Sequence, residues 1–121
     1  MEKHLVPIDP ALLALMPFAR EIMLVEAQIA GTSHRELKDT EPALVSGALL
    51  VLKRESANPH DPLAIMIFTE AGEHLGYVPR AKNEALARLM DAGKLLFARL
   101  ESKAWQGDWL KVEVRIYLRD L

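Results

Sequence analysis

The clearest pattern in the chain is an alternation of apolar and polar residues near its C-terminal end. Apolar residues occupy every second position from Leu110 to Leu118, and charged residues or tyrosine lie between them. This period of two predicts a β-strand with one face in the core and the other in solvent. Residues 106–108 form a turn signal between this segment and residues 95–103, so we expect the two segments to form a β-hairpin.

Four further apolar runs predict the rest of a mainly β fold. They cover residues 22–29, 47–53, 63–68 and 74–78. The run at 63–68 is apolar on both faces, which is expected for a strand in the middle of a sheet or barrel wall. Gly72 supplies the positive φ of a hairpin turn between the last two runs.

One α-helix is predicted, after Pro79 ends the strand before it. Apolar residues recur at three- and four-residue spacing between residues 81 and 90 and line one face. Glu84 and Arg88 form a favourable i,i+4 pair, and Gly93 stands where a left-handed C-terminal cap is expected. About six short strands with one helix predict a small OB-like or SH3-like β-barrel over residues 21–121.

Residues 1–20 are expected to be an extension in front of the barrel. Asp9 is placed to cap a short helix over residues 10–16. The extension is interpreted either as a lid over one end of the core or as a docking segment for a partner protein, and the pattern favours neither. Its apolar stretch, residues 11–19, is too short for a membrane span and lacks the basic start of a signal peptide.

Composition limits the kinds of partner that the protein can have. The chain has 121 residues, a formal net charge of −2 and no cysteine. Its length fits one domain, and its near-balanced charge excludes a polycation that grips phosphate by net charge alone. Any anionic ligand must therefore bind at a local patch of positive charge. The absence of cysteine excludes disulfides and thiolate metal sites and, with the N-terminal pattern, favours a cytoplasmic location without membrane attachment. No pattern indicates an oligomeric state.

No sequence pattern indicates catalysis, a metal or a cofactor. The chain has neither a Walker-type phosphate loop nor a nucleophile elbow. Its histidines lie too far apart in sequence to form a local pair of metal ligands. They are His4, His34, His60 and His74. We therefore expect a non-catalytic protein.

One segment stands out from the rest. Residues 53–65 join a basic strand end to a turn rich in Asn, Pro and Asp, and residues 76–80 follow soon after. Taken alone, Asn58-Pro59 and Asp61-Pro62 are good turn formers, and a purely structural role accounts for them.

In combination, these residues resemble the HIRAN domain over residues 25–103. This β-barrel module occurs at the front of Rad5-type and helicase-like-transcription-factor DNA remodelling ATPases, and as a short stand-alone bacterial protein. The resemblance rests on Ile29-Ala30-Gly31, Leu52-Lys53-Arg54-Glu55, Asn58-Pro59-His60-Asp61-Pro62-Leu63-Ala64-Ile65, and Gly72 followed by Leu75-Gly76-Tyr77-Val78-Pro79-Arg80.

The resemblance implies an OB-like barrel that binds single-stranded DNA at a free 3′ end, with a place in DNA repair. It implies that Asp61 receives the terminal hydroxyl, and that His60 and His34 occupy positions of aromatic base stackers. The remaining pocket and phosphate contacts are assigned to Arg35, Lys53, Arg54, Asn58, Tyr77 and Arg80. A carboxylate accepts a hydrogen bond from a hydroxyl and repels a continuing phosphodiester, so one Asp can distinguish a strand end from its interior.

The chain departs from the DNA-binding members of this family at three positions. His34 and His60 stand where those members carry Tyr, and Ser33 stands where a basic residue is expected. A histidine ring offers less stacking area than a tyrosine ring. Two alternatives therefore accompany DNA binding: a protein-interaction or regulatory module with a degenerate pocket, and a metal-assisted nuclease accessory that uses His60 and Asp61.

Overall fold

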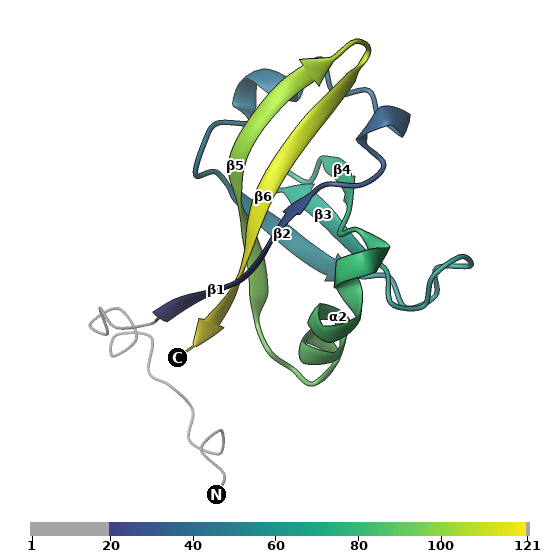
Figure 1. The fold of residues 1–121 in the computed structure, drawn as a ribbon, viewed down its shortest axis with the longest axis vertical. Helices are drawn as coiled ribbons and strands as arrows, with labels where there is room; N and C mark the ends of the chain where they lie inside the picture. Colours follow the sequence, from purple (N-terminus) through teal and green to yellow (C-terminus); the bar gives the residue numbers. More distant parts are fainter. Residues whose placement is uncertain (1–19, 121) are drawn as a thin grey trace, which may run out of the picture.

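The computed structural model describes residues 20–120, which form one six-stranded antiparallel sheet (Figure 1). The strand order is β1-β6-β5-β2-β3-β4. The strands are β1 (Arg20–Gln28), β2 (Leu49–Arg54), β3 (Ile65–Thr69), β4 (His74–Tyr77), β5 (Leu96–Gln106) and β6 (Trp109–Asp120). The prediction of a mainly β fold with about six strands and one α-helix is confirmed.

The two outermost strands of the sheet meet just beyond the end of β1. Ala30 N–H donates to the Tyr77 carbonyl at 2.8 Å, and Tyr77 N–H donates to the Ala30 carbonyl at 2.9 Å. Gly76 permits this approach, because a Cβ there would lie 2.2 Å from the Ala30 carbonyl oxygen. The sheet therefore curls into an OB-like barrel in which the end of β1 lies against β4.

The β5–β6 hairpin is the longest element (Figure 1). The burial of alternate residues along β6 confirms the predicted pattern. The hairpin turn contains Gly107, with φ of 63°. Every second residue of β6 points inward, because a strand presents alternate side chains to opposite faces. The buried set is Leu110, Val112, Val114 and Ile116.

The one α-helix within residues 20–120, α2 (Asn83–Asp91), follows the short 3-10 helix η3 (Arg80–Lys82) and lies beside the lower end of the barrel in Figure 1. Of the predicted apolar face, Leu86 is buried and Leu89 and Met90 pack against the core, whereas Ala81 and Ala85 are exposed and Ala87 is buried instead. Gly93, with φ of 92°, donates to the Met90 carbonyl at 2.9 Å and ends the helix as expected. None of the helices formed by residues 20–120 is long and apolar enough to cross a bilayer.

The structure differs from the sequence pattern in two places. The run at residues 63–68 becomes a strand only from Ile65, because Asp61 first holds the chain in a turn. The long connection after β1 contains two 3-10 helices that no periodicity predicted, η1 (Thr32–His34) and η2 (Glu41–Ala43). The predicted extension and its short helix lie outside the described residues, except that β1 starts at Arg20.

Candidate nucleic-acid interface

A pocket of about 320 Å³ opens between the end of β1, the loop that joins β2 to β3, and the residues that follow β4. Its lining consists of Ala30, Gly31, Asn58, His60, Asp61, Ala64, Tyr77, Val78 and Arg80. It therefore gathers the predicted site residues Asn58, His60, Asp61, Tyr77 and Arg80. Another pocket, of about 350 Å³ near Glu70, contains none of the predicted residues.

Asn58 organises the loop at one wall of this pocket. Its Oδ1 accepts hydrogen bonds from the backbone N–H groups of His60, at 2.8 Å, and Asp61, at 3.0 Å. Its Nδ2 donates to Glu55 Oε1 at 2.7 Å. Such a side-chain-to-backbone turn is the usual reason for Asn in a tight loop. Here it fixes the backbone of His60 and Asp61, so both are presented from a rigid corner.

Asp61 is held by donors on both carboxylate oxygens. Oδ1 accepts from Leu63 N–H at 2.9 Å, and Oδ2 accepts from Asn83 Nδ2 at 2.8 Å. The pKa of Asp61 lies below its ordinary value. The hydrogen bond from the Leu63 N–H is the largest cause, and the hydrogen bond from the Asn83 amide is the next. The Asp61 side chain keeps 15% of its surface exposed. Because a carboxylate has about four acceptor positions, this ionised group can still accept a hydrogen bond from a ligand in the pocket.

Tyr77 is oriented by a carboxylate beneath the same loop. Its hydroxyl donates to Glu55 Oε1 at 2.7 Å, on the oxygen that Asn58 also contacts. Donation to this carboxylate raises the pKa of Tyr77, while the hydrogen bonds from Asn58 and then Tyr77 lower the pKa of Glu55. The phenol ring of the pocket is therefore fixed by Glu55, a residue that sequence reasoning did not assign to the site.

Arg80 is the cation nearest to the Asp61 carboxylate. Its side chain is 76% exposed, and its Nε lies 3.6 Å from Asp61 Oδ2. One terminal nitrogen donates to the His60 carbonyl at 3.1 Å. These contacts leave most of the guanidinium in solvent at the mouth of the pocket, where a phosphate can reach it.

Arg54 and Lys53, two of the predicted site residues, lie outside the pocket lining. Arg54 extends beneath the loop and donates to the carbonyls of Ala64, at 2.6 Å, and Pro62, at 2.9 Å. It also binds Asp91 of α2, and this hydrogen bond is the largest cause of the lowered pKa of Asp91. Arg54 therefore supports the loop from below. Lys53 projects from β2 on the outer face of the sheet, with Nζ 5.2 Å from the centre of the Phe68 ring.

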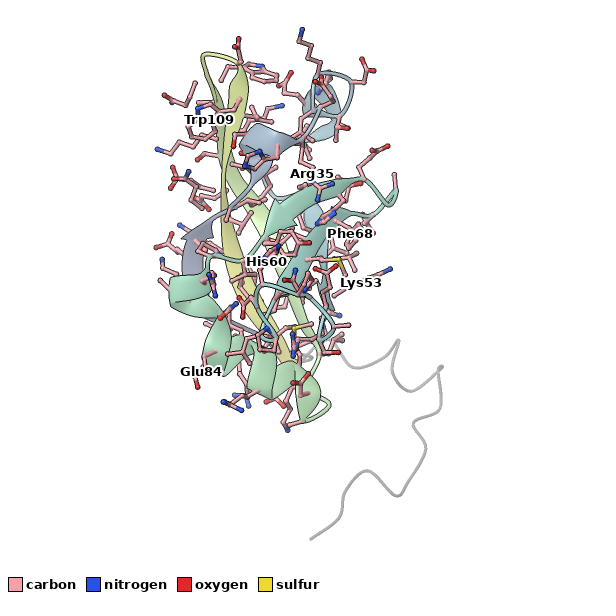
Figure 2. All side chains as sticks on the ribbon, turned by 90° about the vertical axis from the view of Figure 1, so that its right-hand side faces the viewer. Arg35, Lys53, His60, Phe68, Glu84 and Trp109 are labelled. Carbon is pink, nitrogen blue, oxygen red and sulfur yellow. The ribbon has the colours of Figure 1, made fainter. Side chains whose placement is uncertain are left out.

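His34 and Arg35 also lie outside the pocket lining, in and just after η1. Both are exposed, and Gly31, with φ of 84°, starts the turn that carries them. Figure 2 shows Arg35 on the same face of the molecule as His60 and Lys53. The structure therefore brings five of the nine predicted residues together in the pocket and leaves His34, Arg35, Lys53 and Arg54 outside its lining.

Asn83 is the main residue that the sequence did not reveal. It is the first residue of α2 and is 97% buried, with only 3% of its surface exposed. It contacts Asp61 across 22 positions in the chain. An Asn at a helix start ordinarily suggests a cap, so no signal in the sequence distinguished it.

The described residues offer little for metal chemistry. Residues 20–120 contain no group of three or more histidine and carboxylate side chains arranged to hold a metal ion. The pocket itself presents an ionised carboxylate, a phenol ring, an imidazole and an exposed guanidinium.

Comparison with known proteins gives one family and two similar structures. A model of the HIRAN domain matches residues 22–119. A crystal structure of a protein from Lactobacillus plantarum is 26% identical, with a TM-score of 0.77, and the match covers 84% of this chain and 98% of that one. The crystal structure of the HIRAN domain of human HLTF is 14% identical, with a TM-score of 0.64 over 83% of this chain and 80% of that one. No curated protein matches the chain.

Proposed function

Because the chain belongs to the HIRAN domain family, we propose that it binds single-stranded DNA and recognises a free 3′ end in the pocket beside Asp61. The family is known for DNA binding, and its domain is a binding domain rather than a catalytic one. The proposal accordingly assigns no catalytic step, metal or cofactor to the site.

The observation that carries the proposal is the state of Asp61. Its carboxylate lines an open pocket, is held ionised by Leu63 N–H and Asn83, and keeps an unused acceptor position. A terminal 3′-hydroxyl donates a hydrogen bond to such a group. A 3′-phosphate or a continuing phosphodiester brings negative charge against it, so the pocket favours a strand end.

The other pocket residues suit the rest of a terminal nucleotide. Tyr77 and His60 offer rings against which bases can stack, a contact that tolerates any sequence. Arg80 offers a charge to the nearest phosphate. With a formal net charge of −2, the whole chain gives no general attraction to DNA, so binding depends on these local contacts.

A titration with three labelled oligonucleotides tests the proposal. One carries a free 3′-hydroxyl, one a 3′-phosphate, and one only a free 5′ end. We expect the hydroxyl form to bind at least about tenfold more tightly than the other two, as a charge-assisted hydrogen bond allows.

The same titration distinguishes the alternatives. Equal and weak binding to all three oligonucleotides would contradict end recognition and favour a protein-interaction or regulatory module. Loss of the full-length oligonucleotide over hours, only with a divalent metal, would instead favour a nuclease accessory built on His60 and Asp61.

A further inference from the structure

Three aromatic rings run outward from the pocket across two strands. Tyr77 lies edge-on to His74, with ring centres 5.2 Å apart. His74 in turn stacks on Phe68, with ring centres 4.7 Å apart and an interplanar angle of 24°. Phe68 and His74 are direct cross-strand partners on β3 and β4. The ring of Tyr77 in the pocket is thus the first of a continuous row on the outer face of the sheet.

Two cations without acidic partners lie along this row. Lys53 Nζ lies 5.2 Å from the centre of the Phe68 ring. The charge of Arg35 acts to lower the pKa of His74, Tyr77 and Glu55. Within residues 20–120, Arg35 is the one arginine without a carboxylate oxygen within 4.0 Å, and Lys53 has none either. Figure 2 shows Arg35, Phe68, Lys53 and His60 on the same face.

The geometry of His74 favours a stacking role. One ring nitrogen, Nε2, lies 3.0 Å from the Gly76 carbonyl oxygen, which fixes the plane of the imidazole. The pKa of His74 lies below its ordinary value. Burial of the ring is the largest cause, and the charge of Arg35 is the next. His74 is therefore neutral at pH 7 and contributes a flat ring between two others.

We propose that His74 and Phe68, which continue the row outward from Tyr77, carry together with Arg35 and Lys53 the nucleotides that precede the 3′-terminal one. This inference rests on the proposed function and extends it from an end-binding pocket to a track. Stacked rings with cations alongside form the combination that binds single strands, since rings take bases and cations take phosphates. The track is continuous with the pocket through Tyr77, and Arg35 and Lys53 offer positive charge to the phosphates of a strand that leaves the pocket. The Glu55 carboxylate, which accepts a hydrogen bond from the Tyr77 hydroxyl, lies at the pocket end of the row.

A length series tests the track. Thymidine oligonucleotides with a free 3′-hydroxyl, from about two to about ten nucleotides long, are titrated against the whole chain. We expect affinity to rise up to a length of about three or four nucleotides and then level off, because the row offers two rings beyond Tyr77. The rise should be about fivefold or more for each base that gains a stacking contact.

Two variants test whether the increase in affinity with oligonucleotide length comes from this row. Phe68→Leu should lower the affinity for the longest oligonucleotide about fivefold and leave the shortest unchanged. Lys53→Ala removes only an exposed side chain, so the protein should fold normally. For the long oligonucleotide, this variant should reduce the slope of log affinity against log salt concentration by about 0.7. Lys94→Ala, at an exposed lysine beyond α2, is the matched control and should change neither.

The outcomes separate the two proposals. If no oligonucleotide prefers its 3′-hydroxyl form, the proposed function fails. If the shortest oligonucleotide binds through its 3′-hydroxyl but affinity does not rise with length, the track alone is contradicted. A length-dependent gain that survives both Phe68→Leu and Lys53→Ala would also contradict it, because the strand would then leave the pocket by another route.

Discussion

Asn83 donates a hydrogen bond to Asp61 across 2.8 Å and so joins the start of α2 to the loop between β2 and β3. The Asn83 side chain is buried, whereas Asp61 lines the pocket. One amide thus fixes one carboxylate oxygen, Oδ2, against the body of the protein. The other oxygen, Oδ1, has only the Leu63 N–H as a donor.

Replacing Asn83 should disturb Asp61 without touching the ligand. In Asn83→Ala, the pKa of Asp61 should rise toward its ordinary value, and the affinity for a 3′-hydroxyl oligonucleotide should fall about three- to tenfold, since one charge-stabilising hydrogen bond is lost. Carboxyl titration by NMR and an oligonucleotide titration measure the two effects.

Glu84→Ala provides the control for this change. Glu84 is the next residue of α2 and forms only an exposed pair with Arg88, so its loss should leave both quantities unchanged. An unchanged pKa for Asp61 in Asn83→Ala would show that Asn83 does not position the carboxylate.

Arg80 is expected to contribute one phosphate contact. Arg80→Ala should weaken binding of single-stranded DNA and reduce the slope of log affinity against log salt by about 0.7. Arg88→Ala is a matched control, because Arg88 is also an exposed arginine but lies on α2 away from the pocket lining. Titrations at several salt concentrations give the slopes. Equal slopes for Arg80→Ala and the unmodified chain would remove Arg80 from the interface.

His74 should make the stability depend on pH below neutrality. Its pKa is lowered in the folded protein, first by burial and then by Arg35, while the Gly76 carbonyl and Glu55 act in the opposite direction. The unfolded chain therefore takes up this proton first as the pH falls below 6.5. The stability from His74 is full above that value and is lost as the pH falls toward the folded pKa.

The variant His74→Phe removes this titration and keeps an aromatic ring beside Phe68. Urea unfolding at several values between about pH 7.5 and about pH 5.5 should show a smaller decline in the free energy of unfolding for the variant than for the unmodified chain. Identical declines would mean that His74 titrates alike in the folded and unfolded states.

Gly76 should be needed to hold β1 against β4. A Cβ there would lie 2.2 Å from the Ala30 carbonyl oxygen and 2.8 Å from the Ile29 side chain. Gly76→Ala should therefore lower the free energy of unfolding by about 1–3 kcal/mol or more, as overpacking does. It should also weaken DNA binding, because Ala30 and Tyr77 both line the pocket.

Gly72→Ala is the comparison variant for this prediction. Gly72 also has positive φ, 98°, but a Cβ there would meet nothing within 4 Å. It should lose only the smaller stability that a strained backbone costs. Denaturant unfolding of both variants measures the difference, and equal losses would show that the contact with Ala30 is not the cause.

The sequence predicted the fold best where one physical pattern acted alone. The inward residues of β6 follow strict alternation, and the apolar face of α2 follows helical spacing. The apolar pattern predicts that the third strand starts at Leu63, whereas β3 starts at Ile65. The apolar character of residues 63–64 is outweighed there by a local hydrogen bond. Asp61 captures the Leu63 N–H that a strand would otherwise use.

The lining of the pocket was predictable where its residues are close in sequence. Asn58, His60 and Asp61 come from one loop, and the same motif placed Tyr77 and Arg80 near them. The roles of Glu55 and Asn83 were not predictable, because Glu55 fixes the Tyr77 ring and Asn83 holds the Asp61 carboxylate through hydrogen bonds that each span 22 positions. The supporting position of Arg54 depends equally on tertiary contact, since it requires α2 to bring Asp91 beneath the loop.

The central claim is that the Asp61 carboxylate selects a 3′-hydroxyl end. Its most direct test is the ratio of Kd for a 3′-phosphate oligonucleotide to Kd for its 3′-hydroxyl counterpart, measured for the unmodified chain and for Asp61→Asn. Asparagine keeps the size and the acceptor for Leu63 N–H but removes the charge. We predict a ratio of at least about ten for the unmodified chain and a ratio near one for the variant. A ratio that is the same in both proteins would contradict the account.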